Sequence, residues 1–191
     1  MAPTDLPSQR ELMRRALLAA GLVLATLVAV ALLRSAGFES KQLAVEPTKV
    51  VAVDTAAVAD RLAAAIRFRT VSHTDRSRID EGEFQRFHRH LRNTYPALHA
   101  VLKRERIAGQ SLLYTWPGRQ SDRPPILLLA HQDVVPVEAG TEKDWEHPPF
   151  AGRVAEGFVW GRGSMDDKGN LVCILEAVEA LVAEGFQPER T

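Results

Sequence analysis

The 191-residue sequence is poor in cysteine and carries no net charge. Its single cysteine, Cys173, excludes an internal disulfide framework and any zinc site built from several cysteines. Its 24 basic and 24 acidic side chains leave a formal net charge of +0. A protein that binds nucleic acid normally has a basic excess that neutralises phosphates, so we expect no nucleic-acid partner.

One long hydrophobic run lies near the N-terminus. Residues 16–33 form a stretch of 18 residues without a charge, and a helix of this length spans roughly 27 Å, close to the thickness of a bilayer core. Arginines at positions 10, 14 and 15 precede the run, and this bias favours a cytoplasmic N-terminus. We therefore expect a cytoplasmic segment at 1–15 and one transmembrane helix at 16–33.

The same run leaves two alternatives open. In the first, a single-pass membrane protein keeps the helix as its anchor, and everything after residue 33 lies outside the cytoplasm. In the second, the run is a signal peptide, whose cleavage leaves a secreted or periplasmic protein. A buried core helix would be unusual for an apolar run of this length so close to the terminus.

The rest of the sequence predicts a linker at 34–53 and a domain at 54–191 in which helices alternate with strands. Helical periodicity predicts helices over 55–68, 83–93 and 168–184. Apolar runs predict strands at 111–116, 126–130 and 158–160, with a long loop at 136–157. The run at 126–130 is wholly apolar, which is typical of a strand buried on both faces of a parallel sheet. This order indicates an α/β fold.

Three further side chains are assigned from their helix positions. His88 and His90 stand among arginines in the predicted helix at 83–93, so we expect them to face solvent. Cys173 lies in the predicted helix at 168–184 and is expected to pack as a small apolar residue.

The first candidate site follows the predicted strand at 126–130. His131 and Asp133 are two residues apart in extended chain and therefore face the same way. Ligands of α/β folds bind at the carboxyl ends of strands. A neutral imidazole is a good zinc ligand, and a nearby carboxylate can orient it. Taken alone, the pair is more typical of a surface histidine followed by a turn-capping aspartate than of a metal site, because short motifs often occur by chance.

A second motif, Gly-Arg-Gly-Ser-Met-Asp-Asp-Lys-Gly at 161–169, opens the last predicted helix. Its glycines permit tight backbone turns. Asp166 and Asp167 lie where the helix dipole favours negative charge, so the pair can simply cap the helix. A carboxylate in this position could instead bridge two divalent metal ions, which two-metal sites hold about 3.5–4 Å apart.

Together these motifs resemble the M20 family of metallopeptidases. The resemblance is closest to the branch that contains carboxypeptidase S and the N-fatty-acyl-amino-acid synthase/hydrolases. It extends over residues 58–191 and is carried by LLLAHQDVVPV, DWEHPPFAG and FVWGRGSMDDKGN, with AIRFRTVS and SLLYTWPG upstream. The joint order and spacing make the match specific, whereas each motif alone is weak.

The resemblance implies a fold and roles for individual residues. It implies the N-terminal part of a metallopeptidase catalytic domain with a mixed, mainly parallel sheet. His131 would ligate one metal, and Asp133 would orient that ligand and assist catalysis. Asp166 would bridge two Zn²⁺ ions, and Asp167 would not be a ligand. The family pattern also implies a cis peptide bond after Asp166.

The family's general base and a neighbouring ligand are a Glu–Glu pair on the next strand, and another acidic ligand and a distant histidine complete its site. None of these has a counterpart before Thr191. We therefore expect the chain to be the N-terminal part of a longer enzyme and to be inactive alone.

The implied function is metal-dependent hydrolysis of a C-terminal peptide bond or an N-acyl amino-acid amide. Its substrates would be peptides or N-acyl amino acids. Synthesis of the same amide is the reverse reaction at the same site. The alternative function is a non-catalytic, membrane-tethered module that retains half a metal site.

Overall fold

The computed structural model describes residues 9–43, 45 and 53–191, and the chain divides into two compact units, Met1–Val50 and Val51–Thr191. In the first unit, α1 (Gln9–Ala36) contains the predicted span and extends beyond it at both ends. No residue of α1 is buried, and the helix is long and apolar enough to cross a membrane. Parts of the predicted cytoplasmic segment (1–8) and linker (44, 46–52) lie outside the described residues.

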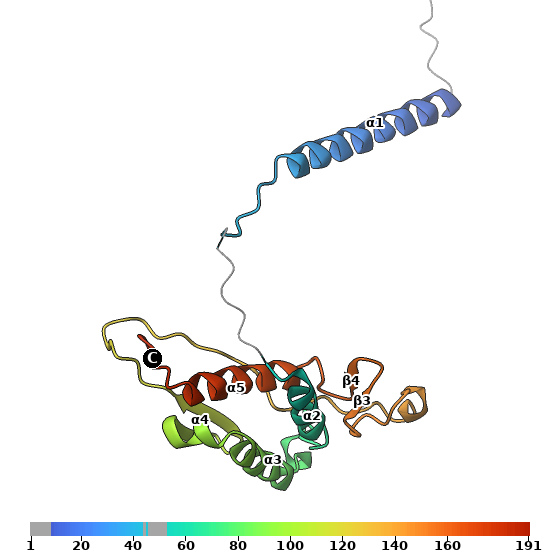
Figure 1. The fold of residues 1–191 in the computed structure, drawn as a ribbon. Coiled ribbons are helices and arrows are strands. Elements are labelled where there is room, and N and C mark those ends of the chain that lie inside the picture. Colours follow the sequence, from blue (N-terminus) through green and yellow to red (C-terminus); the bar gives the residue numbers. More distant parts are fainter. Residues whose placement is uncertain (1–8, 44, 46–52) are drawn as a thin grey trace, which may run out of the picture. The chain divides into compact units, whose positions relative to one another are not determined.

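The second unit is a helical layer with two small strand pairs. Its helices are α2 (Thr55–Ile66), α3 (Glu81–Thr94), α4 (Pro96–Val101) and α5 (Lys168–Ala183). Its strands are β1 (Lys103–Ile107), β2 (Ser111–Thr115), β3 (Arg153–Ala155) and β4 (Phe158–Trp160). Short 3₁₀ turns occupy Arg76–Arg78 and Glu142–Asp144. Figure 1 shows α5 beside α2 and α4, with the β3–β4 pair at one end of α2.

The three predicted helices of this unit are confirmed, and local caps set their ends. The side chain of Asp54 accepts a hydrogen bond from the backbone N–H of Ala57, at 3.1 Å, and begins α2. Asp80 caps α3 in the same way, so this helix starts two residues before its predicted start at residue 83. After α5, Gly185 adopts a φ of +74° and its N–H donates to the carbonyl of Val182, which makes it a glycine C-cap.

One helix and two strands are absent from the sequence-based prediction. Helix α3 ends before Pro96, and Pro96 begins α4, because the fixed φ of proline suits the first position of a helix. Strand β1 is Lys-Arg-Glu-Arg-Ile and lacks apolar alternation, yet it pairs antiparallel with β2 from Lys103–Thr115 to Ile107–Ser111.

Strand β3 lies inside the predicted loop at 136–157 and pairs antiparallel with β4. The connecting turn contains Glu156 at φ +56° and Gly157 at φ +81°. Two successive positive φ values are typical of the tight turn that matches the twist of a hairpin. The predicted strand at 158–160 is therefore confirmed, as one half of a hairpin.

The prediction of a buried strand at 126–130 is wrong. The segment forms no strand, and Leu127, Leu128 and Leu129 are 61–73% exposed. A strand buried on both faces needs partner strands and covering helices, which a local apolar run cannot supply. The mainly parallel sheet is likewise not confirmed, because the described part of the chain has two antiparallel pairs and one isolated parallel bridge, Val71 to Val134.

A single core joins the four helices of the second unit. Its buried members are Ala65, Phe87, Leu91, Tyr95, Leu98, Val172 and Leu175. Fully burying a large apolar side chain contributes about 1.5–3 kcal/mol. Val172 and Leu175 are on the inner face of α5. Cys173 is exposed rather than packed, because the next residue along a helix is rotated by about 100°.

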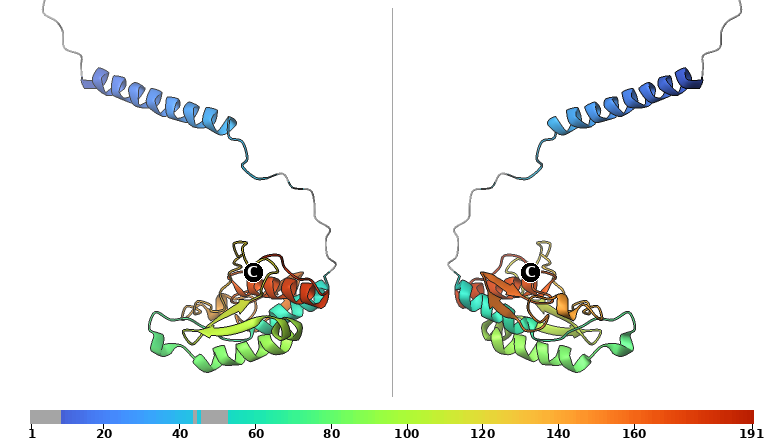
Figure 2. Two further views of the ribbon diagram at one scale, coloured as in Figure 1. Left: turned by 90° about the vertical axis from the view of Figure 1, so that its left-hand side faces the viewer. Right: turned by 90° about the vertical axis from the view of Figure 1, so that its right-hand side faces the viewer.

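The expectation that His88 faces solvent is also wrong. Its side chain is 4% exposed, and its Nε2 atom lies 2.8 Å from Oε1 of Gln132. The basic neighbours on α3 suggested a solvated face, but the hairpin β1–β2 lies next to this helix (Figure 2). His90 is half-buried, with its ring centroid 5.0 Å from that of Phe68.

Candidate metal centre

The segment that carries His131 and Asp133 is held by a short parallel pairing with residues 70–72. The N–H of Val134 donates to the carbonyl of Thr70 at 2.9 Å, and the N–H of Ser72 donates to the carbonyl of Val134 at 3.0 Å. The hydroxyl of Thr70 also donates to the carbonyl of Gln132 at 2.6 Å. Thr70 and Val134 are both buried. These hydrogen bonds hold the backbone around the predicted site, although the preceding segment at 126–130 forms no strand and is exposed.

The loop that carries Asp166 packs closely on this segment because of Gly163. This glycine has a φ of +90°, and a Cβ atom added to it would lie 2.7 Å from Cγ1 of Val134. A side chain here would clash and would also be strained. The peptide bond between Asp166 and Asp167 is cis, as the resemblance implied.

The structure brings the three predicted site residues together around the imidazole of His131. Its Nε2 atom lies 2.8 Å from Oδ1 of Asp166. Its Nδ1 atom lies 2.9 Å from the backbone carbonyl oxygen of Asp133, and 3.5 Å from a carboxylate oxygen of the same residue. The shorter of these distances is a normal hydrogen bond. The main chain of Asp133 therefore orients the ring, and its carboxylate lies just beyond.

Both ring nitrogens of His131 consequently face acceptors. A backbone carbonyl only accepts, and so does an ionised carboxylate, whereas a neutral imidazole carries one hydrogen. The arrangement needs a further proton, on the ring or on the carboxylate of Asp166, or a cation bound by both groups. Partial burial opposes the charged ring, but the hydrogen bonds to Asp133 and Asp166 outweigh this effect and raise the pKa of His131.

The chemistry of these donors fits zinc, but the set is partial. Imidazole nitrogen and carboxylate oxygen are both common zinc ligands, and a catalytic zinc normally has about three protein ligands. In the part of the chain that the structure describes, no group of three or more His, Cys, Asp or Glu side chains is placed to hold a metal. His131 and Asp166 are thus two donors of a larger expected set.

Two neighbours take positions that the sequence did not assign. Asp167, for which no ligand role was expected, accepts a hydrogen bond from the backbone N–H of His131 at 3.1 Å. Lys168 is fully buried, and its ammonium donates to the carbonyls of Ala65 at 3.0 Å and Phe68 at 2.6 Å. Burial lowers the pKa of Lys168 to about 8. The only sequence signal for either residue is its place in the Asp-Asp-Lys-Gly motif.

These contacts tie the start of α5 to the candidate site. Lys168 is the first residue of α5, and its carbonyl partners lie at the end of α2 and just beyond it. Asn170, one turn into the same helix, donates to the carbonyl of Leu129 at 3.2 Å. The contacts of Lys168 therefore position the chain just after Asp166, and the contact of Asn170 with Leu129 positions the chain just before His131.

A hollow lies beside the loop that follows His131. It has a volume of about 400 Å³ and is lined by Arg69, Val137, Glu142 and residues 148–151. The guanidinium of Arg69 lies 4.8 Å from the ring centroid of Phe150. Its size falls within the range of small-molecule pockets, which is about 300–1,000 Å³.

Comparisons with known proteins identify relatives of this chain. The family model described as "Peptidase family M20/M25/M40" matches residues 127–191, which include His131, Asp133 and Asp166. In Dictyostelium discoideum, a protein named "Probable carboxypeptidase S-like 2" is 46% identical over 136 residues, covering 70% of this chain and 26% of that protein. Carboxypeptidase S of Saccharomyces cerevisiae is 41% identical over 139 residues, which cover 69% of this chain and 24% of that protein.

The similarity extends to animal proteins and to a solved structure. An N-fatty-acyl-amino acid synthase/hydrolase of Bos taurus is 31% identical over 157 residues, covering 81% of this chain and 30% of that protein. A crystal structure of an M20 family metallo-carboxypeptidase from Sulfolobus solfataricus matches with a TM-score of 0.52 and 22% identity, over 67% of this chain and 28% of that chain. This match shows a similarity of fold. The chain spans about a quarter of the length of the first curated relatives it matches.

Proposed function

The chain belongs to the M20 peptidase family, and from this premise we propose that it supplies the first half of the active site of a metal-dependent hydrolase. The similarity to carboxypeptidase S and to an N-fatty-acyl-amino acid synthase/hydrolase supports this proposal. The hydrolase would cleave a C-terminal peptide bond or the amide bond of an N-acyl amino acid. Hydrolysis and synthesis are the two directions of one reaction at the same site.

The observation that carries the proposal is the meeting of His131 and Asp166. An imidazole nitrogen and a carboxylate oxygen lie 2.8 Å apart, and the other ring nitrogen is already committed to the carbonyl of Asp133. A metal ion bound between them would satisfy both acceptors without a second ring proton. In this proposal His131 ligates one Zn²⁺ ion, and Asp166 bridges a pair of them.

The roles of the remaining groups follow from the same contacts. His131 and Asp166 would hold the zinc, and the bound metal would supply a water of lowered pKa and a Lewis acid for the carbonyl of the substrate. The backbone carbonyl of Asp133 keeps the proton of His131 on Nδ1, which leaves Nε2 free as a donor of electrons to the metal. The carboxylate of Asp133 lies 3.5 Å from that Nδ1 atom, where it adds negative charge beside the ligand.

The proposal includes a membrane location. Helix α1 would hold the chain in a membrane as a single-pass anchor, with the hydrolase part outside the cytoplasm. The alternative is a signal peptide that is removed, which would leave the same part secreted or periplasmic.

A chimera tests the catalytic proposal. The part of Saccharomyces cerevisiae carboxypeptidase S that aligns with this chain is replaced by the matching part of this chain, so that the rest of the relative completes the enzyme. We expect the chimera to release a C-terminal amino acid from a peptide, and a chelator to abolish that activity until zinc is returned. Asp166→Asn in the chimera should reduce kcat by at least about 1,000-fold, the size of effect that loss of key electrostatic groups produces.

The matched control is Asp122→Asn, which removes an exposed carboxylate from the loop before residue 126. Its activity should stay within about twofold of the parent chimera, because surface substitutions of this kind change stability little. An active chimera that resists the chelator, or that tolerates Asp166→Asn, would refute the assigned roles.

One observation favours the second candidate, a membrane-tethered module without catalysis. The described residues bring two zinc donors together rather than three or more. The 191-residue chain by itself is then expected to bind zinc weakly and to show no turnover. A metal-dependent release of amino acid by the purified 191-residue chain would exclude this alternative.

A further inference from the structure

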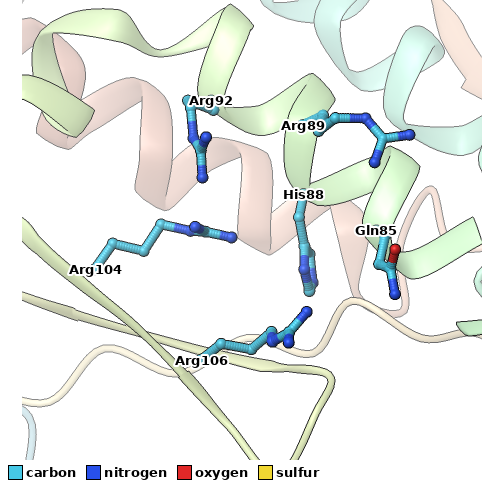
Figure 3. Close-up of a pocket in the computed structure, with 6 residues that line it drawn as sticks. All are labelled: Gln85, His88, Arg89, Arg92, Arg104 and Arg106. Carbon is cyan, nitrogen blue, oxygen red and sulfur yellow. The ribbon is translucent and has the colours of Figure 1, made fainter. Parts of the chain in front are cut away.

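A hollow between α3 and β1 is lined almost entirely by nitrogen-rich side chains. We refer to it as the arginine hollow, and its walls are Gln85, His88, Arg89, Arg92, Arg104 and Arg106 (Figure 3). No acidic side chain is among them. The volume is about 240 Å³, which is below the range of about 300–1,000 Å³ for drug-sized ligands. A small anion is therefore the type of ligand that the space and the charge both suit.

Local sequence periodicity brings these side chains together. Gln85, Arg89 and Arg92 of α3 are three, four or seven positions apart, and His88 is three positions from Gln85 and four from Arg92, so the four side chains lie on neighbouring parts of one helix face. On β1, Arg104 and Arg106 are two positions apart and share a face, whereas Glu105 between them points to the other side. Figure 3 shows both guanidinium groups directed toward His88, with Arg92 extending toward Arg104.

The positive charge of the hollow is uncompensated by its surroundings. None of the ion pairs found in residues 9–43, 45 and 53–191 includes an arginine of the hollow. The Nε atom of Arg104 is buried and has no hydrogen-bond partner within the same residues. Converging cations repel each other, and the repulsion is strongest where Arg104 is half-buried, because Arg89, Arg92 and Arg106 are exposed to solvent. A bound anion would relieve the repulsion and satisfy the orphaned donor.

His88 gives the hollow a fixed wall. Its Nε2 atom is 2.8 Å from Oε1 of Gln132, and the side-chain amide of Gln132 in turn donates to the carbonyl of Gln110. Burial, together with the nearby charges of Arg104 and Arg106, lowers the pKa of His88. The ring therefore acts as a neutral, oriented wall, and a site that is already ordered loses less entropy when a ligand binds.

We propose that the arginine hollow binds a ligand that carries a phosphate group. A guanidinium matches phosphate oxygens with two parallel N–H···O bonds, which makes arginine the preferred residue for phosphate recognition. Several guanidinium groups around one small space suit the double charge and several oxygens of phosphate better than the single charge of a carboxylate. The ligand can be a free phosphate compound or a lipid head group, since both present the same chemistry. The hollow shares no lining residue with the proposed hydrolase centre at His131, Asp133 and Asp166, and the two are linked through the contact of His88 with Gln132.

Isothermal titration calorimetry of the 191-residue chain in uncharged detergent micelles tests the proposal. The probes are inorganic phosphate, pyrophosphate and glycerol 3-phosphate, with acetate at the same ionic strength for comparison. We expect saturable one-to-one binding of at least one phosphate compound and none of acetate. Preference for pyrophosphate or phosphate would indicate a free ligand, and preference for glycerol 3-phosphate would indicate a lipid head group.

The paired variant Arg104→Gln/Arg106→Gln should weaken this binding by at least about 100-fold, because each lost charged hydrogen bond costs about tenfold or more. Arg92→Gln removes a guanidinium from α3 and should weaken it about tenfold. The matched control is Lys103→Gln, which removes a charge from the same strand but on the opposite face, where Lys103 pairs with Glu105 at 3.1 Å. Its affinity should change less than about threefold, and circular dichroism should show that every variant is folded.

Two results would overturn the proposal. The first is the absence of saturable binding of all three phosphate compounds to the folded chain. The second is binding that the folded double variant retains with unchanged affinity. Because neither measurement involves catalysis, failure of the hydrolase proposal would leave these results unaffected.

Discussion

His88 shows how burial of one residue couples stability to pH. Burial lowers the pKa of His88 in the folded chain, whereas the unfolded chain keeps an ordinary value near 6.5. Below that value the unfolded state binds more protons than the folded state, so the free energy of unfolding falls as the pH falls through about 6.5. We expect His88→Gln to remove part of this fall, up to about 1.4 kcal/mol per pH unit.

The measurement is urea unfolding of both proteins at several pH values between about 7 and 5. Arg86→Gln serves as the control, because Arg86 is exposed on the same helix and keeps its charge throughout this range. It should shift the free energy of unfolding without changing its pH slope. Equal slopes for wild type and His88→Gln would show that His88 is as easily protonated in the folded chain as in the unfolded one.

At the scale of single residues, the motifs at 131–133 and 161–169 were recognisable in the sequence because they are short and local. His131 and Asp166 lie in contact in the structure, whereas their roles as metal ligands stay a prediction. The burial of His88 and Lys168 depends on contacts with distant segments, at Gln132 for one and at Ala65 and Phe68 for the other. Such contacts leave no periodic signal in the sequence.

At the scale of elements, α1 gives a prediction that the single cysteine can test. Cys173 is exposed on α5, in the second unit of the chain. If α1 spans a membrane with its N-terminus in the cytoplasm, a membrane-impermeant maleimide should label Cys173 in intact cells. The chain should also stay with the membrane after alkaline extraction, whereas a chain freed by signal cleavage would be labelled but soluble.

The control places a cysteine before the apolar run. Glu11→Cys in a Cys173→Ser background should stay unlabelled until the cells are permeabilised. Labelling of Glu11→Cys but not of Cys173 in intact cells would reverse the assigned orientation. Protection of both positions in intact cells would place the second unit on the cytoplasmic side.

Helices and strands differed in how well they could be predicted, for a physical reason. A helix closes its hydrogen bonds within one segment, so the apolar spacing was a sufficient signal, and the caps at Asp54 and Gly185 are local features of the same kind. A strand depends on a partner that can be far away in the sequence. The apolar run at 126–130 therefore gave a wrong strand prediction, because the described residues contain no partner strand for it. The strand β1 was not predicted, because its sequence is mostly charged.

At the scale of the whole molecule, the fold and the candidate site share one core. Phe87 is fully buried in the cluster that joins the four helices of the second unit, and its ring centroid lies 4.9 Å from the ammonium of Lys168. Lys168 begins α5 directly after the Asp166–Asp167 pair. A substitution at Phe87 should therefore lower the free energy of unfolding and also remove a contact of Lys168 at the start of α5.

Phe87→Ala should lower the free energy of unfolding by about 3–5 kcal/mol, the range for removing a buried phenylalanine and leaving a cavity. All three tryptophans, at positions 116, 145 and 160, lie in the second unit, so their fluorescence during urea unfolding reports on this core and not on α1. The control, Val101→Ala, removes a side chain that is 51% exposed and should change the value by about 0.5 kcal/mol or less. A loss below about 1 kcal/mol for Phe87→Ala would mean that the four helices do not depend on one shared core, and the start of α5 would then be held by polar contacts, those of Lys168 with two carbonyls and of Asn170 with the carbonyl of Leu129.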